Sequence, residues 1–435
     1  MFLGNTSRNG DVNRHHEPRS AGLRPGSLGS RPRPLEDRRS GSSKAPAGWR
    51  TPIVLLVALL LTGCATDHYA HLKFTGDPLV DGENAIQNGP PRDRVLWEYR
   101  TALAAMRRGQ FDVAKRNLDD AIARISSIYG KDAAARKSRG TFQAEAKKTF
   151  LGEPYERVMA WYLRGILYWR DGEPDNARAC FRSGQLADSD AEKKAWASDY
   201  VLLDYLDGYI TDKLGGDGSD AMKRAGAVAQ QWKPPAFSTN ANALVFVDYG
   251  AAPVKFASGA YGEQLRFRPQ ASHARNAVAK IGSTTGKAVP YDDLVFQATT
   301  RGGRVMDHVL ANKAVFKGAT DTFGNVALIT GAALTTRRET EVAGLATMGA
   351  GLISKILASA ANPAADTRAW DNLPQSLSFV AFELPPGAHT LTVEFLDEAG
   401  RPLSGQSRTI NFEMPAGGHD KVIYVSDKSS TPQSQ

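Results

Sequence analysis

Asp366, Arg368 and Trp370 form a cluster of polar and aromatic residues whose types could bind a ligand or partner. They stand at alternate positions just before a stretch that reads as β-strands. A carboxylate and a guanidinium two residues apart can pair across a turn. We therefore predict first a structural junction at the entrance to a β section, and second a binding site at these three residues.

The motifs that would indicate an enzyme or a metal site do not occur in the sequence. In GSTTGKA, three residues separate Gly282 and Gly286, where a phosphate-binding loop needs four, and no apolar strand precedes them. H-E-x-x-H and G-x-S-x-G are both missing, and the six histidines after residue 63 are scattered. We therefore expect a polar turn at 282–288, no catalytic residue, no metal and no cofactor.

The two cysteines, Cys64 and Cys180, are predicted to differ in chemistry. Cys64 follows nine uncharged apolar residues, Ile53 to Leu61, which are too few to span a bilayer. A basic, Arg-rich stretch precedes this run, and small residues end it, as in a secretory signal. Cys180 lies among apolar helix positions and is interpreted as a small buried hydrophobe.

Leu61-Thr62-Gly63-Cys64 resembles the lipobox of bacterial lipoproteins, in which the cysteine thiol carries a diacylglycerol. The resemblance implies that residues 1–63 are a basic extension and signal peptide that is removed. The mature chain would then start at a lipidated Cys64, with the membrane as a partner. Ala65 in place of Asp favours the outer membrane, facing the periplasm, over the inner membrane. The alternative is a short buried strand that ends in an unrelated cysteine.

Charge excludes nucleic acid as the expected partner. The whole chain has 54 basic and 46 acidic residues. Removing residues 1–63 takes away ten basic and four acidic residues, which leaves 44 against 42 and a net charge of +2. The basic character therefore belongs to the leader, and no electrostatic footprint for nucleic acid remains.

Residues 93–233 show a repeating helical pattern with glycine turns. The stretch from Trp161 matches the tetratricopeptide (TPR) pattern W-x2-L-G-x2-Y and A-x3-F, with Arg164 in place of the leucine. A second stretch, from Leu96, aligns with it. A weaker third pair turns at Gly215-Gly216. An ordinary helical bundle with chance matches is the alternative. The matched residues are Trp161, Gly165, Tyr168, Ala177 and Phe181.

A TPR-like array implies a concave groove lined by the first helix of each pair. Aromatic and arginine side chains there would anchor an envelope protein partner. The alternative is that these side chains pack against the third pair or the next domain. The expected groove residues are Tyr99, Leu103, Met106, Arg107, Tyr162, Ile166, Trp169 and Arg170.

The remaining segments complete an α+β prediction, in which TPR-like repeats precede a mixed, mainly antiparallel β domain. Alternating apolar residues predict strands within 241–427, which the strand at 243–248 would join, and a short strand at 291–297. We expect a flexible tether over 64–92 and a disordered tail over 428–435. The apolar run 342–361 is predicted to be a helix that is buried, contacts a second copy in a homo-oligomer, or enters the membrane.

The lipobox, the helical repeats containing Tyr155-Glu156-Arg157, and the Asp366-x-Arg368-x-Trp370 segment before a Pro-Pro-Gly hairpin together resemble a family of largely uncharacterised TPR-containing bacterial lipoproteins. The resemblance implies this architecture and no particular activity. The lipid anchor and the TPR-like array together predict a non-catalytic, membrane-anchored periplasmic adaptor in envelope assembly or regulation. The alternatives are a periplasmic hydrolase acting on cell wall or lipid, and a structural subunit of an oligomeric envelope complex.

Overall fold

The computed structural model describes residues 69–129, 148–189, 197–299, 364–430 and 433–434. The helices are α2 (Pro78–Asn88), η1 (Pro91–Asp93), α3 (Arg94–Arg107), α4 (Phe111–Tyr129), α6 (Pro154–Arg170), α7 (Pro174–Asp188), α8 (Val201–Lys213), α9 (Ser219–Val228) and α10 (Leu294–Thr299). The strands are β1 (Ala243–Tyr249), β2 (Val254–Ser258), β3 (Gln264–Arg268), β4 (Asn276–Ile281), β5 (Thr284–Ala288), β6 (Asp292–Asp293), β7 (Ser376–Phe382), β8 (Gly387–Leu396), β9 (Arg408–Met414), β10 (Lys421–Ser426) and β11 (Gln433–Ser434). The α+β fold class is confirmed.

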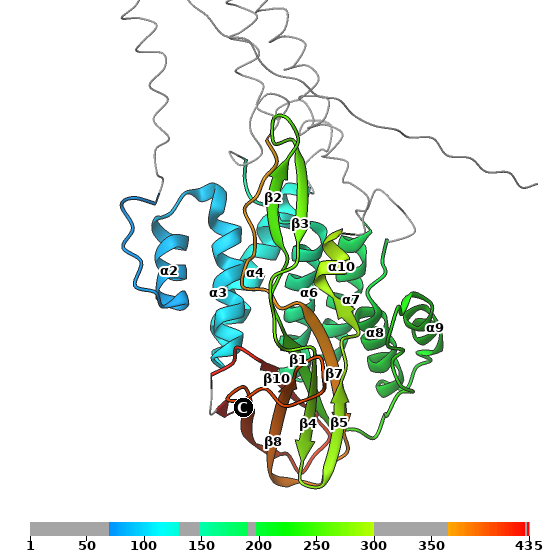
Figure 1. The fold of residues 1–435 in the computed structure, drawn as a ribbon. Helices are drawn as coiled ribbons and strands as arrows, with labels where there is room; N and C mark the ends of the chain where they lie inside the picture. The colour runs from blue at the N-terminus through cyan, green and yellow to red at the C-terminus, as the bar shows by residue number, and fades with distance from the viewer. Residues whose placement is uncertain (1–68, 130–147, 190–196, 300–363, 431–432, 435) are drawn as a thin grey trace, which may run out of the picture. The chain divides into compact units, whose positions relative to one another are not determined.

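Three helical hairpins, α3–α4, α6–α7 and α8–α9, follow one another as the glycine turns predict (Figure 1). Gly109, Gly172 and Gly215 occupy the turns with φ of 72°, 82° and 81°, a left-handed conformation that costs glycine little because it lacks a Cβ. The assignment of these hairpins to the TPR class stays a prediction.

Gly165 shows why a small residue stands in the middle of α6. A Cβ at this position would lie 2.6 Å from the ring of Phe181 in α7, closer than packed atoms can approach. The missing side chain therefore lets α6 and α7 approach each other, with the Phe181 ring between them. Both positions are among those that match the repeat pattern.

The strands form two sheets and a separate ribbon. One sheet has the order β10-β1-β7-β6, in which β1 and β10 are parallel and the other pairs antiparallel. The other has the order β11-β9-β8-β4-β5, and β2 and β3 form the ribbon. The mainly antiparallel prediction is confirmed, and so is the expectation that the strand at 243–248 joins the C-terminal strands.

Strand β1 shows how the layers are stacked. Leu244 and Phe246 belong to the core shared with the helices, whereas Val245 and Val247 belong to the core between the two sheets. Because both faces of β1 are covered, its sequence is a continuous apolar run up to Asp248 rather than an alternating one. The helices, the β1 sheet and the β8 sheet are therefore three successive layers.

Three local predictions are wrong. Helix α2 forms inside the predicted flexible tether, because Asp77 caps its N-terminus by accepting from Leu79 N and the helix packs on α3. The predicted strand at 291–297 is only the two residues of β6, followed by α10. In the predicted disordered tail, Ser430 N donates to Arg107 O, and β11 pairs with β9.

Two other predictions concern the membrane. The predicted helix at 342–361 lies outside the described residues, as does Cys64. Within the part of the chain that is described, no helix is both long enough and apolar enough to cross a bilayer.

Candidate functional site

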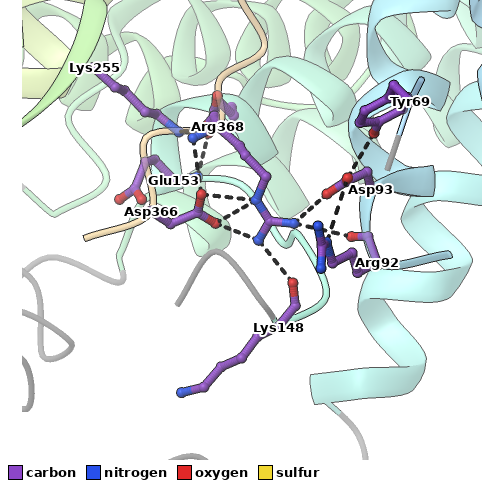
Figure 2. Close-up of polar contacts among 9 residues, drawn as sticks. Tyr69, Arg92, Asp93, Lys148, Glu153, Lys255, Asp366 and Arg368 are labelled. Atoms are coloured by element: carbon purple, nitrogen blue, oxygen red, sulfur yellow. Dashed lines mark hydrogen bonds and ion pairs between the residues drawn. The ribbon is translucent and has the colours of Figure 1, made fainter. Parts of the chain in front are cut away.

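The structure brings the Asp366–Trp370 segment against the starts of α3 and α6 (Figure 2). Two linked groups of charges form there, one around Arg368 and one around Glu156. We call them together the polar junction, defined by Asp93, Glu156, Lys255, Asp366 and Arg368. All five are buried or half-buried.

Arg368 joins three segments of the chain. Its Nε donates to Asp366 Oδ1 at 2.9 Å, its Nη1 to Asp93 Oδ1 at 2.5 Å, and its Nη2 to the backbone oxygen of Lys148 at 2.9 Å. Burial lowers the pKa of Arg368 and its two carboxylate partners raise it, with a net upward shift that keeps the guanidinium charged. The predicted brace between Asp366 and Arg368 is thus confirmed.

Glu156 is the second centre of the polar junction. It closes a capping box at the start of α6, where its Oε2 accepts from Glu153 N at 2.6 Å. The same Oε2 accepts from Lys255 Nζ at 2.6 Å, and Oε1 accepts from Trp370 N at 2.7 Å. One carboxylate therefore ties α6 to the β2 ribbon and to the 366–370 segment.

Lys255 completes this arrangement from β2. Its Nζ also donates to the backbone oxygen of Arg368 at 2.9 Å. The side chains of Lys255 and Glu156 are 1% and 0% exposed, so the pair is taken fully out of water. A buried pair of this kind persists only when other hydrogen bonds support it, and here Arg368 O and Trp370 N provide them.

Trp370 is packed inside the protein and does not project into solvent. Its ring is fully buried and stacks on Tyr99 of α3, with centroids 4.3 Å apart and planes 16° apart. Two hydrogen bonds extend the same contact. Asn372 Nδ2 donates to the backbone oxygen of Arg100, and Arg100 Nη2 donates to the backbone oxygen of Ala369. The segment is therefore fastened along α3.

For most of the expected groove residues the alternative applies: they pack against the chain's own sheet and C-terminal segments, which cover the inner side of the hairpins. Tyr162 and Trp169 both contact Phe246 of β1, with centroids 6.2 Å apart in each case, and Trp169 Nε1 donates to Asp420 at 2.9 Å. Arg170 is half-buried over the ring of Phe111. The expected groove residues that are buried are Tyr99, Leu103, Met106, Arg107, Tyr162, Ile166 and Trp169.

Sequence reasoning missed the roles of Asp93, Glu156 and Lys255. Pro154 and Glu156, just before an apolar helical run, were signals of a helix N-terminus. A lone lysine inside the apolar strand segment Val254–Ser258 was a second signal. Neither signal says that the two side chains meet, because 99 residues separate them.

Two further features have ordinary structural roles. Cys180 is buried as predicted, and burial raises the pKa of its thiol to about 12. A shallow hollow of about 410 Å³ is lined by His71, Asn88, Gly89, Pro90, Pro91 and Arg92. The His71 ring is hydrogen-bonded to the backbone oxygen of Asn88. Among the described residues, no three histidine, cysteine or carboxylate side chains gather as metal ligands would.

The geometry of the polar junction favours cohesion over catalysis. Its two carboxylates at the helix starts and its two cations meet one another, the Asp366 carboxylate and backbone groups of the chain. A general acid or base must reach a substrate proton, and these groups point into contacts between elements instead. Comparison with known protein families, with curated proteins and with solved structures found no match.

Proposed function

We propose that the chain is a lipoprotein, anchored through Cys64 in the outer membrane, that serves as a non-catalytic adaptor for another envelope protein on the periplasmic side. The observation that carries the proposal is the Leu61-Thr62-Gly63-Cys64 exit of a basic and apolar leader. Two or three acyl chains at such a cysteine hold a protein on a membrane firmly. The polar junction supports the adaptor role, because it gives the body a rigid, cross-braced frame.

The partner surface lies on the second helices of the hairpins in this proposal. The first helices, α3, α6 and α8, are almost wholly buried between their partner helices and the sheet. Helix α7 keeps an exposed face, and Leu186 on it is 74% exposed. An apolar side chain of this size and exposure is a suitable probe for protein contact.

Photo-crosslinking in cells tests the adaptor role. A photoreactive residue at Leu186 is expected to give a discrete adduct with a second envelope protein. The matched control is Tyr162, which is 1% exposed and should crosslink only within the chain. If positions on the exposed faces of α4, α7 and α9 all give no intermolecular adduct, the adaptor proposal is wrong.

Replacement of the cysteine tests the anchor. Cys64→Ala removes the thiol that would carry the diacylglycerol, so we expect the protein to leave the membrane fraction or to remain as the unprocessed precursor. Cys180→Ala is the control, because Cys180 is buried and should leave fractionation unchanged. A processed Cys64→Ala protein that stays with the membranes would show that Cys64 is not the anchor.

A further inference from the structure

The described part of the chain begins only a few residues after Cys64, the proposed anchor. Tyr69 is the first described residue, and it is fixed in place because its hydroxyl donates to Asp93 Oδ2 at 2.7 Å. Five residues of extended chain span at most about 17 Å. If Cys64 carries lipid, the surface around Tyr69 therefore cannot lie far from the membrane.

That surface is an aromatic cluster made by Tyr69, Phe74 and Trp97. The ring of Phe74 stacks on Trp97 with centroids 5.8 Å apart, and Tyr69 meets Trp97 at 6.0 Å. Trp97 Nε1 donates to the Tyr69 hydroxyl at 3.0 Å. The Tyr69 hydroxyl and the Trp97 indole N–H thus have partners within the protein, and stacking on Trp97 holds the Phe74 ring against α3.

Two large apolar side chains in this region face water. Phe74 is 47% exposed, and Val80, in the first turn of α2, is 54% exposed. Hydrogen bonds join the segment after Phe74 to the first turn of α2, since Thr75 N and Gly76 N both donate to the Asp81 carboxylate, at 2.6 and 2.8 Å. We call Phe74, Val80 and the exposed Lys73 beside them the α2 surface.

We propose that the α2 surface rests on the phospholipid headgroup region of the membrane that holds the Cys64 lipid. This inference depends on the proposed anchor and adds a fixed orientation to it. Aromatic and aliphatic side chains favour the boundary between headgroups and acyl chains, and a lysine beside them favours anionic headgroups. The lipid brings the body to the bilayer, and the α2 surface determines which face meets it.

Spin labels on the full-length, processed protein, purified and reconstituted into vesicles of phosphatidylethanolamine and phosphatidylglycerol, test the orientation. Phe74→Cys and Val80→Cys place the label on the α2 surface, and Leu186→Cys on α7 is the control. Labelling is selective, because Cys64 is a thioether in the processed protein and Cys180 is a buried, protonated thiol. We expect collisions of the label with oxygen, relative to a polar nickel chelate, to be several-fold more frequent at 74 and 80 than at 186.

The outcomes separate this inference from the anchor. Labels at 74 and 80 that meet the nickel chelate as freely as the label at 186, in a protein that floats with the vesicles, overturn the orientation alone. A protein that does not float with the vesicles overturns the anchor and the orientation together. Using two labelled positions guards against a local disturbance by either substitution.

Discussion

Glu156→Gln is expected to lower the free energy of unfolding by about 3–5 kcal/mol, because it leaves the buried ammonium of Lys255 without a counter-charge. The substitution keeps the size of the side chain, so the loss comes from charge and hydrogen bonding rather than from a cavity. It also weakens the capping box at Glu153 and the contact with Trp370 N. Denaturant unfolding of the parent and the variant at neutral pH measures the change.

The reason for so large an effect is the position of the pair. Both side chains are almost completely buried, so water cannot replace the lost partner of Lys255. The contact also joins α6 to the β2 ribbon and the 366–370 segment, so its loss weakens the attachment between these elements. Replacing both partners by methionine should recover part of the loss, because neither charge then remains buried.

A surface ion pair provides the matched control. Lys280 and Glu394 lie 2.7 Å apart, but their side chains are 42% and 28% exposed. Glu394→Gln should therefore cost less than about 1 kcal/mol, since exposed pairs contribute little. If Glu156→Gln costs no more than Glu394→Gln, the buried pair does not stabilise the junction as argued.

The sequence was informative where the structure depends on local contacts. Glycine turns at Gly109 and Gly172, the close approach at Gly165, and the brace between Asp366 and Arg368 all involve neighbours in the chain or in one hairpin. Each could be predicted because residue type and spacing decide it. The alternating residues of β8 likewise identified a strand with one covered face.

The predictions failed where distant segments decide the outcome. Helix α2 was missed because its Gly and Asp residues break the apolar period, and its stability depends on packing against α3. The repeat pattern identifies the inner face of the hairpins but not the element that covers it, so the sequence left a partner groove and packing against the next domain as alternatives. Phe246 of β1 fills that place, and nothing local to Tyr162 or Trp169 indicates it.

Asp292 makes a second, pH-dependent contribution to stability. It lies in β6, is buried, and accepts from Val201 N at 2.8 Å and Leu202 N at 2.9 Å, where α8 begins. Burial raises the pKa of its carboxyl from 3.8 to about 7, the two backbone donors oppose this, and the nearby Asp199 and Asp188 add to it. The folded chain therefore holds a proton at Asp292 at pH values where the unfolded chain has lost it.

The sign of the pH effect follows from this difference. Between the unfolded pKa of 3.8 and the folded pKa of about 7, the folded state binds more protons than the unfolded state, so stability falls as pH rises. A shift of this size corresponds to roughly 4 kcal/mol across the interval. The contribution is fully present below the unfolded pKa and is lost as pH rises through the folded pKa.

The effect of Asp292→Asn on stability should change sign across this pH interval. The amide cannot ionise, but it keeps only one acceptor oxygen for the two N–H groups of α8. At about pH 4 the variant should be less stable than the parent by about 1 kcal/mol, and at about pH 8 it should be more stable by roughly 3 kcal/mol. Denaturant unfolding across this pH range measures the difference in stability between variant and parent. The contributions of other titrating groups cancel in that difference.

Asp220→Asn is the control, at a side chain that is 84% exposed, and its stability should follow that of the parent at every pH. A constant difference between Asp292→Asn and the parent would mean that Asp292 is already ionised in the folded state throughout the range, and that the two backbone donors at the start of α8 outweigh its burial.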